Sequence, residues 1–115
     1  KNVNDTFGHD IGDKVLEEFT GVIKHTLREN DMIYRWGGEE FIILVKDKNN
    51  KHLQLLTNKL KNAITRFNFT KVGFISSSFG VAVATQEDTK DTLLKRADEN
   101  LYKAKQSGRN CIVMD

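Results

Sequence analysis

Two adjacent carboxylates beside a double glycine could bind a metal ion. Glu39 and Glu40 directly follow Gly37 and Gly38, between two short runs rich in β-branched and aromatic residues. If the chain reverses tightly at the glycines, both carboxylates project from the tip of a hairpin. Mg²⁺ is typically held by one or two carboxylates together with substrate phosphates and water, so a magnesium site is one interpretation. The other is an acidic turn that simply faces solvent.

Two basic residues near the end of the chain could bind phosphate groups. Lys105 and Arg109 bracket Gly108, where a predicted helix ends. An ammonium group is a compact point charge and a guanidinium is a planar fork, and both suit a triphosphate. Basic side chains at a helix C-terminus also complement the helix dipole, which would explain the same pair without a ligand.

A polar, glycine-bearing segment over residues 4–13 could recognise a guanine base. The Asn4 amide could pair with the ring acceptors, and the Asp13 carboxylate could accept hydrogen bonds from the ring N–H and the amino group. Such a pocket rejects the wrong base because its own polar groups are then left unpaired. Turn formation and helix capping by the same residue types offer a simpler explanation.

Apolar spacing predicts the helices and strands that must position these groups. Asp10 is expected to cap the first helix, and Gly80 to mark a bulge or a close approach of the backbone. The alternation of elements indicates a mixed sheet covered by helices. The predicted helices cover residues 11–29, 51–67 and from Thr89 or Asp91 to Gly108; the predicted strands cover 32–36, 41–45 and 110–114, with one or two more within 72–84. The inward face of the third helix is expected to hold Leu93, Leu94, Ala97, Leu101, Tyr102 and Ala104.

The composition excludes several classes of protein. The chain has 115 residues, a formal net charge of +2, 38% hydrophobic residues, one cysteine and no proline, which is typical of a single soluble domain. Its charges are interspersed, so we expect no nucleic-acid binding. No apolar run reaches the roughly 18 residues of a spanning helix, and the first residues do not resemble a signal peptide. We therefore expect a cytoplasmic domain without membrane contact, whether or not the parent protein is anchored in a membrane.

Cys111 is expected to be a buried thiol. As the single cysteine it cannot form an internal disulfide or a cysteine metal cluster, and it lies in the apolar run Cys111-Ile112-Val113-Met114. Redox chemistry is therefore not expected.

Several short motifs follow one another along the whole chain. Together, in this order and at this spacing, they resemble the motifs of the GGDEF-domain family, the diguanylate cyclases, which join two GTP molecules into cyclic dimeric GMP (cyclic di-GMP). One such motif would be weak, but agreement of several in order is not a chance event. The motifs are Asn4-Asp5, Gly8-His9, Gly12-Asp13, Arg35-Trp36-Gly37-Gly38-Glu39-Glu40-Phe41, Ser78-Phe79-Gly80-Val81-Ala82, Arg96-Ala97-Asp98-Glu99-Asn100-Leu101-Tyr102-Lys103-Ala104-Lys105 and Gly108-Arg109-Asn110.

The resemblance implies a fold, a cofactor and residue roles. The fold would be α+β, of the nucleotidyl-cyclase or palm-like type, with a ferredoxin-like mixed β-sheet flanked by helices. Mg²⁺ or Mn²⁺ would be the cofactor, GTP the substrate, and a homodimer the active form. Glu39 would ligate the metal, and Glu40 would position the metal or the attacking hydroxyl. The remaining implied roles are the turn next to the triphosphate for Gly37 and Gly38, guanine recognition for Asn4 and Asp13, and phosphate binding for Lys1, Lys105 and Arg109.

The resemblance also implies feedback by the product. Arg28-Glu29-Asn30-Asp31 matches the family's Arg-x-x-Asp inhibitory site, at which cyclic di-GMP binds and holds the domains unproductively. Arg28 and Asp31 would then be its ligands. A pair at this spacing would also form an ordinary ion pair at a helix end, worth roughly 0.2–0.5 kcal/mol.

The match is incomplete at the N-terminus. Upstream of the Asn-Asp motif the family carries a strand that ends in Asp-x-Asp-x-Phe-Lys, and its first Asp is a metal ligand. This sequence begins with Lys1, at the Lys of that pattern. We therefore expect residues 1–115 to form a single GGDEF domain that lacks its first central strand, and to show little or no cyclase activity alone. The alternatives are a catalytically inactive GGDEF module that senses GTP or cyclic di-GMP, and a purely structural dimerisation domain.

Overall fold

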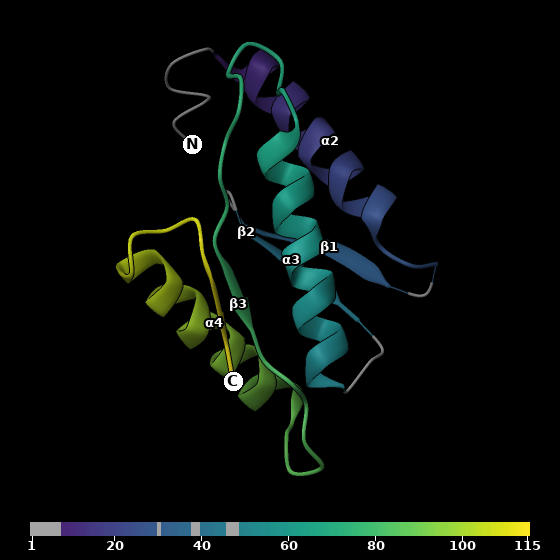
Figure 1. The fold of residues 1–115 in the computed structure, drawn as a ribbon, viewed down its shortest axis with the longest axis vertical. Coiled ribbons are helices and arrows are strands. Elements are labelled where there is room, and N and C mark those ends of the chain that lie inside the picture. The colour runs from purple at the N-terminus through teal and green to yellow at the C-terminus, as the bar shows by residue number, and fades with distance from the viewer. Residues whose placement is uncertain (1–7, 30, 38–39, 46–48) are drawn as a thin grey trace. The chain divides into compact units, whose positions relative to one another are not determined.

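The computed structural model describes residues 8–29, 31–37, 40–45 and 49–115 and has an α+β fold (Figure 1), which confirms the predicted fold class. The chain divides into two compact units, residues 1–46 with 62–75 and residues 47–61 with 76–115. The expectation of a single domain stays a prediction. The elements in chain order are α2 (His9–Thr26), β1 (Met32–Gly37), β2 (Glu40–Leu44), α3 (Asn50–Arg66), β3 (Phe79–Val81), α4 (Lys90–Gln106) and β4 (Ile112–Met114).

Helix α2 forms because its apolar residues recur at helical spacing, and Val15 and Ile23 are buried on that stripe. The helix begins two residues earlier than predicted. Gly8 is the N-cap residue, with a φ of 88° and no side-chain cap, so the prediction that Asp10 caps the helix is wrong. Asp10 instead lies in the first turn, where its charge complements the positive end of the helix dipole.

Strands β1 and β2 form the predicted hairpin. They pair antiparallel, with Met32 opposite Leu44 and Tyr34 opposite Ile42, and the register shifts between Arg35 and Gly37. Because successive side chains of a strand point to opposite faces, this register places the side chains of residues 32, 34, 42 and 44 on one face and that of Phe41 on the other.

Aromatic residues join this hairpin to α2 and to the segment that follows α3. Phe19 of α2 stacks on Phe41 with ring centroids 5.0 Å apart, and on Phe69 at 6.4 Å. Phe69 is almost fully buried and makes an edge contact with Phe67 at 4.7 Å. These rings form the apolar centre of the first unit, because aromatic pairs gain both from burial and from ring geometry.

A turn over residues 69–73 replaces part of the predicted strand within residues 72–84. Phe69 and Gly73 exchange backbone hydrogen bonds of 2.9 Å, and Lys71 and Gly73 have positive φ angles of 68° and 77°. Positive φ angles belong to tight turns and not to extended strands. The strand prediction is therefore right only for β3, which has three residues.

The second unit is a parallel strand pair with a helical connection. β3 pairs with β4, Phe79 opposite Ile112 and Val81 opposite Met114, and α4 lies alongside both strands (Figure 1). Among the described residues the strands therefore form two two-stranded ladders, one antiparallel and one parallel. Both kinds of pairing expected of a mixed sheet are present, but in separate ladders.

Gly80 confirms the predicted close approach of the backbone. A Cβ atom built at this position would lie 2.6 Å from Leu101 Cα and closer still to Leu101 N and Ala97 O, all backbone atoms of α4. Real Cβ atoms essentially never come within 3.0 Å of such atoms. Glycine is therefore required here so that β3 can lie directly against the helix.

Helix α4 begins and ends where the sequence predicts. Thr89 caps it through a capping box with Thr92. At the other end Gly108 has a φ of 101°, and the Arg109 N–H donates to Ala104 O at 3.1 Å, which is the Schellman arrangement.

Two expectations for the region of α4 and β4 need correction. Tyr102 is 64% exposed, so its placement on the inward face is wrong; it follows Leu101 by 100° around the helix and lies beyond the edge of the apolar stripe. Cys111 is only partly buried, and its thiol donates to Ala104 O at 3.3 Å.

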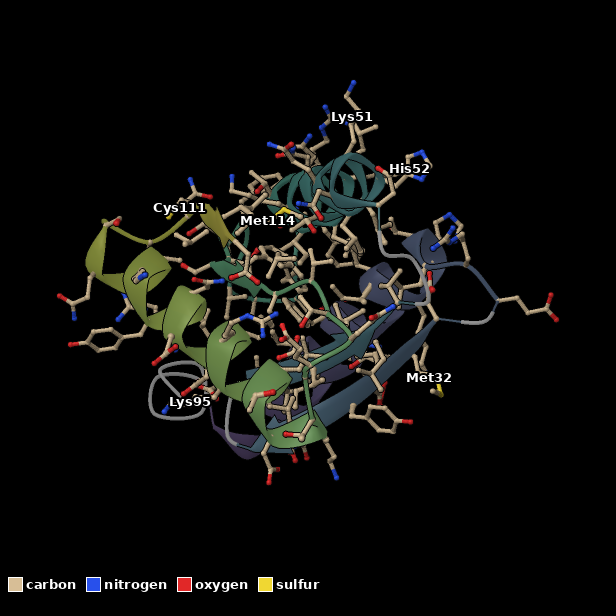
Figure 2. All side chains as sticks on the ribbon, turned by 90° about the horizontal axis from the view of Figure 1, so that it is seen from below. Met32, Lys51, His52, Lys95, Cys111 and Met114 are labelled. Atoms are coloured by element: carbon tan, nitrogen blue, oxygen red, sulfur yellow. The ribbon has the colours of Figure 1, made fainter. Side chains whose placement is uncertain are left out.

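Helix α3 carries one apolar and one polar face. Leu53, Leu60 and Ile64 recur at helical spacing and are buried. Lys51 and His52 in its first turn project away from the helix (Figure 2). Within the described residues, no helix is both long and apolar enough to cross a bilayer.

Candidate functional site

The structure describes seven of the predicted site residues. Lys1, Asn4, Gly38 and Glu39 lie outside the described residues, and their roles stay predictions. The other seven fall into the two units. Asp13, Arg28, Asp31, Gly37 and Glu40 lie in the first unit, and Lys105 and Arg109 lie in the second.

The hairpin of the first unit ends at the predicted catalytic turn. Gly37 is the last residue of β1, Glu40 is the first residue of β2, and the two are partners in the ladder. The Glu40 carboxylate is half-buried, and its oxygen atoms are of the kind that Mg²⁺ prefers. Across the described residues, no group of three or more Asp, Glu, His or Cys side chains is placed to hold a metal ion. The predicted ligand Glu39 is outside that set.

Asp13 lies exposed near the N-terminal end of α2. The preceding residue, Gly12, is buried, and its N–H donates to Gly8 O at 3.1 Å in the first turn. The helix thus fixes the backbone on which Asp13 projects toward solvent. An exposed carboxylate in this place can accept hydrogen bonds from a ligand, as guanine recognition requires.

The predicted phosphate-binding residues lie at the C-terminal end of α4. Lys105 is half-buried in the last turn, and Arg109 is exposed just beyond the helix, with a φ of 63°. The Schellman arrangement at Gly108 turns the chain sharply between them, so Arg109 leaves the helix axis. Both interpretations, phosphate binding and complementing the helix dipole, remain compatible with this position.

A polar network that the sequence analysis missed is centred on Arg96 and Asn100, within α4. Arg96 forms ion pairs with Asp88 and, through Nε, with Asp115 at 3.1 Å, and its Nη2 donates to Val83 O at 2.6 Å. The Asn100 side-chain amide donates to Val81 O at 2.8 Å and to Asp115 at 2.9 Å. Since Val81, Val83 and Asp115 belong to the strand region, the network ties α4 to β3 and β4. Two members of the Arg96 to Lys105 motif thus have a structural role.

The charges of this network favour ionised carboxylates. Hydrogen bonds from Arg96, from the Thr85 backbone and from Thr92 hold the pKa of Asp88 well below its usual range. Burial works against ionisation of Asp115, but hydrogen bonds from Asn100, Arg96 and the Val83 N–H outweigh it and lower the pKa of that carboxyl. The pKa of Arg96 is raised by the same partners, Asp88 first.

The predicted inhibitory pair forms a closed turn in the first unit. Asp31 Oδ2 accepts hydrogen bonds from the Arg28 backbone N–H at 3.0 Å and from Arg28 Nε at 3.4 Å, and the Asp31 N–H donates to Arg28 O at 3.0 Å. The Asp31 side chain is 2% exposed and that of Arg28 is 58% exposed. The structure therefore brings the two residues together and leaves the guanidinium accessible.

A cavity of about 460 Å³ opens at this turn. Arg28 and Asp31 line it, together with Lys24 of α2 and with Met32 and Tyr34 of β1. The sequence analysis missed Met32 and Tyr34. A signal was available, because alternate residues of a strand share a face, so positions 32 and 34 would lie together beside Asp31.

Comparison with known proteins identifies the chain. A family model described as "Diguanylate cyclase, GGDEF domain" matches residues 1–111 of this α+β chain. The chain therefore belongs to the GGDEF diguanylate cyclase domain family. This confirms the resemblance read from the motifs.

Named relatives are similar over nearly the whole chain. Response regulator PleD of Caulobacter vibrioides is 40% identical over 119 residues, which cover 98% of this chain and 26% of that protein. Diguanylate cyclase DgcS of Shewanella oneidensis is 39% identical over 113 residues, 96% of this chain and 37% of that protein. The chain thus spans about a quarter to a third of the length of these relatives.

Solved structures show the same fold. The active GGEEF domain of a diguanylate cyclase from Vibrio cholerae superposes with a TM-score of 0.87 at 29% identity, over 97% of this chain and 73% of that one. A microbial GGDEF domain described for its interaction with cyclic di-GMP gives a TM-score of 0.80 at 31% identity, over 99% and 71%. The fold described above is therefore that of GGDEF domains.

Proposed function

We propose that this chain is the catalytic domain of a diguanylate cyclase that condenses two GTP molecules into cyclic di-GMP and two pyrophosphates. The observation that carries the proposal is the β1–β2 hairpin, which ends with Gly37 opposite Glu40 in a chain matched to the family over residues 1–111. The names of the relatives support it. In each of two equivalent steps, the 3′-hydroxyl of one GTP attacks the α-phosphate of the other, and the bond to pyrophosphate breaks.

The residues on the first unit would bind and orient GTP. Asp13 is exposed and would accept hydrogen bonds from the guanine N–H groups, with Asn4 as its partner. The absence of side chains at Gly37 and Gly38 would let the hairpin backbone approach the triphosphate closely. Binding of this kind converts an encounter of two reactants into a fixed geometry, which lowers the barrier through orientation.

Lys105 and Arg109 of the second unit, with Lys1, would bind the phosphates. Arg109 stands beyond the end of α4 on a backbone fixed by the Gly108 turn. Cationic groups near the α-phosphate would stabilise the negative charge that grows on its oxygens and on the leaving pyrophosphate.

Glu39 would hold Mg²⁺ or Mn²⁺, and Glu40 would help to position it or the attacking hydroxyl. Carboxylate oxygens fit this role, because Mg²⁺ prefers oxygen ligands and is commonly held by one or two carboxylates plus phosphates. When bound, the metal supplies positive charge at the phosphate oxygens. Glu40, half-buried at the start of β2, would hold its carboxylate at a fixed place relative to the hairpin.

A homodimer would be the active form. Each domain would hold one GTP, so two domains must face one another across a two-fold axis before either 3′-hydroxyl can reach an α-phosphate. A monomer would then bind GTP without turning it over, and dimerisation would be the point of control.

Feedback by cyclic di-GMP at Arg28 and Asp31 completes the proposal. An ordinary ion pair would need neither an accessible Arg28 guanidinium nor a cavity beside it. Both features therefore support a ligand site. The same cavity favours the second candidate function, an inactive module that senses cyclic di-GMP. Turnover of GTP separates the two.

The test measures GTP turnover by the full-length protein that carries this chain, with Mg²⁺, and detects cyclic di-GMP directly. The Glu39→Ala variant is compared with Glu87→Ala, which removes an exposed glutamate from a turn of the second unit. Product from the parent and from Glu87→Ala, but not from Glu39→Ala, would support the cyclase and the metal role. If the parent forms no product even at concentrations high enough to force dimers, but binds cyclic di-GMP saturably, the result would favour the inactive sensor module.

A further inference from the structure

The outer face of the β1–β2 hairpin exposes three large apolar side chains. Met32, Tyr34 and Leu44 are 43%, 48% and 42% exposed, although each lies within or at the end of a paired strand. The register explains why they lie together, because Met32 is opposite Leu44 and Tyr34 is two residues further along the same strand. Exposed apolar groups that gather on one face commonly mark a binding surface.

Two of these three side chains belong to the cavity at the Arg28–Asp31 turn. Met32 and Tyr34 line it, and Leu44 is not among its lining residues. The Tyr34 hydroxyl donates to Met32 Sδ at 3.2 Å, which restrains the tyrosine ring beside the methionine. Figure 2 shows Met32 at the outer edge of the hairpin, pointing away from the strands.

The chemistry of this cavity suits a planar base that carries phosphate. Tyr34 offers an aromatic side chain, and Arg28 offers a guanidinium that is 58% exposed. Lys24 and Glu29 add one further charge of each sign to the lining. Bases stack on aromatic rings whatever their identity, since every base has a π-face, while phosphates pair with basic side chains.

We propose that Tyr34 is the stacking platform for one guanine of cyclic di-GMP in the inhibitory site. The inference rests on the proposed feedback function and goes beyond it, since it adds a ligand-binding residue outside the Arg-x-x-Asp motif. Arg28 binds phosphate and the base edge, and Tyr34 supplies affinity without reading the base. Met32 supports the ring from the side through its sulfur.

The exposure of Tyr34 separates this role from a structural one. A ring that is nearly half exposed buries little area, so its removal changes the free energy of unfolding only slightly. Loss of a stacked base, by contrast, weakens ligand binding by about 5- to 100-fold. Binding and stability should therefore respond differently to the same substitution.

The experiment titrates cyclic di-GMP into the full-length protein by calorimetry and compares single variants. Tyr34→Ala should raise the Kd at least about fivefold, and Tyr34→Phe, which keeps the ring but loses the hydroxyl, should stay within about threefold of the parent. Tyr34→Leu keeps apolar bulk without a planar ring and should behave like Tyr34→Ala. Tyr102→Ala removes a tyrosine from α4 that is more exposed than Tyr34, 64% against 48%, and should leave the Kd unchanged.

Cyclic di-AMP as a second ligand tests whether the platform is indifferent to the base. Tyr34→Ala should weaken both ligands by a similar factor, so that the preference for guanine is kept. Thermal melting of each variant shows that it is folded.

The outcomes distinguish this inference from the function on which it rests. If the parent does not bind cyclic di-GMP at all, the feedback function fails and Tyr34 has no role in it. If Arg28→Ala abolishes binding but both Tyr34→Ala and Tyr34→Leu bind like the parent, feedback stands and the platform is wrong. A Tyr34→Phe variant as weak as Tyr34→Ala would also overturn it, because the hydroxyl and not the ring would then matter.

Discussion

Two arginine–aspartate pairs of the same chemistry are used differently in the two units. Arg96 of the second unit has each of its three nitrogens engaged, by Asp88, Asp115 and Val83 O, and its side chain is 31% exposed. Arg28 of the first unit meets Asp31 at a longer 3.4 Å and is 58% exposed beside a cavity. The ion pairs of Arg96 hold α4 against the strands of the second unit. The Arg28 guanidinium, by contrast, is accessible to a ligand.

Spacing and residue type alone therefore do not separate a structural ion pair from a binding site. Only the pair of Arg28 and Asp31 was marked by spacing in the sequence, since Arg96 lies 8 residues from Asp88 and 19 from Asp115. What separates them is how exposed the arginine side chain is, 58% for Arg28 against 31% for Arg96. A buried or saturated pair that loses one partner leaves an uncompensated charge, whereas an exposed pair contributes little to folding.

The largest expected effect is a loss of stability on disrupting the close backbone contact between β3 and α4 in the second unit. Gly80→Ala should destabilise the protein by about 3 kcal/mol or more, because the new Cβ would collide with backbone atoms of Leu101 and Ala97, which cannot move aside as a side chain can. Urea unfolding followed by circular dichroism measures this loss.

Gly21→Ala is the matched control for that measurement. Gly21 lies within α2, on the first unit, and a Cβ built there meets nothing within 4 Å. Alanine in a helix interior should stabilise by roughly 0.5–1 kcal/mol. Equal destabilisation by both substitutions would contradict the close packing of β3 on α4.

The next prediction contrasts the two arginines directly. Arg28→Ala should raise the Kd for cyclic di-GMP by about tenfold to hundredfold through lost charge-assisted hydrogen bonds, and relieve feedback on GTP turnover. Its effect on unfolding should be smaller than that of Arg96→Ala, because the Arg28 guanidinium is 58% exposed and the Arg28 backbone N–H, which the substitution keeps, still donates to the buried Asp31 carboxylate. Arg96→Ala should do the reverse, lowering the melting temperature without a specific loss of inhibition by cyclic di-GMP.

Calorimetric titration and thermal melting on the same preparations check this contrast. If Arg28→Ala melts well below the parent and Arg96→Ala does not, the two pairs have been assigned to the wrong roles.

The third prediction uses acid to weaken the ion pairs of Arg96. The folded state lowers the pKa of Asp88 and Asp115, so both bind fewer protons when folded than when unfolded. Their stabilisation is therefore complete above the usual carboxyl pKa of about 4 and is lost as the pH falls below it. Unfolding free energies measured from pH 7 to pH 3 should fall steeply for the parent and less steeply for Asp88→Asn. Parallel curves for the two proteins would rule out this source of acid sensitivity.

Much of this fold was predictable because apolar periodicity is a strong local signal. All three helices were placed to within about three residues at each end, and the hairpin and the contact at Gly80 were expected from residue type alone. The failures have local causes. The N-cap residue of α2 is Gly8, with a φ of 88°, and not Asp10. A turn with positive φ angles at Lys71 and Gly73 occupies the start of the region where a strand was expected.

The site was less predictable than the fold. Spacing identified Arg28 and Asp31, and the structure brought them together as an exposed turn beside a cavity. Tyr34 was missed because a cavity depends on how α2 meets β1 in three dimensions, and a strand tyrosine carries no local mark that it is exposed. The proposed roles of Glu39, Asn4 and Lys1 come from the order of the motifs alone. Motif order indicates which chemistry a residue could perform but not where its side chain lies.

The smallest expected effect tests whether the first unit also contains a saturated polar contact. Glu18 of α2 accepts hydrogen bonds from the Thr70 backbone N–H at 2.9 Å and from the Thr70 hydroxyl at 2.7 Å. These bonds, the backbone one first, lower the pKa of Glu18. The contact therefore joins α2 to the turn at residues 69–73 more firmly when Glu18 is charged.

Glu18→Gln should cost about 1 kcal/mol, because an amide oxygen still accepts but the charge that strengthens both bonds is gone. Thr70→Val removes the hydroxyl from the other side and should cost a similar amount. The double variant should lose less than the sum of the two, since each single change already weakens the shared contact. Full additivity in denaturant unfolding would mean that Glu18 and Thr70 act independently. The contrast between the pair beside the cavity and the structural pairs would then rest on Arg28 and Arg96 alone.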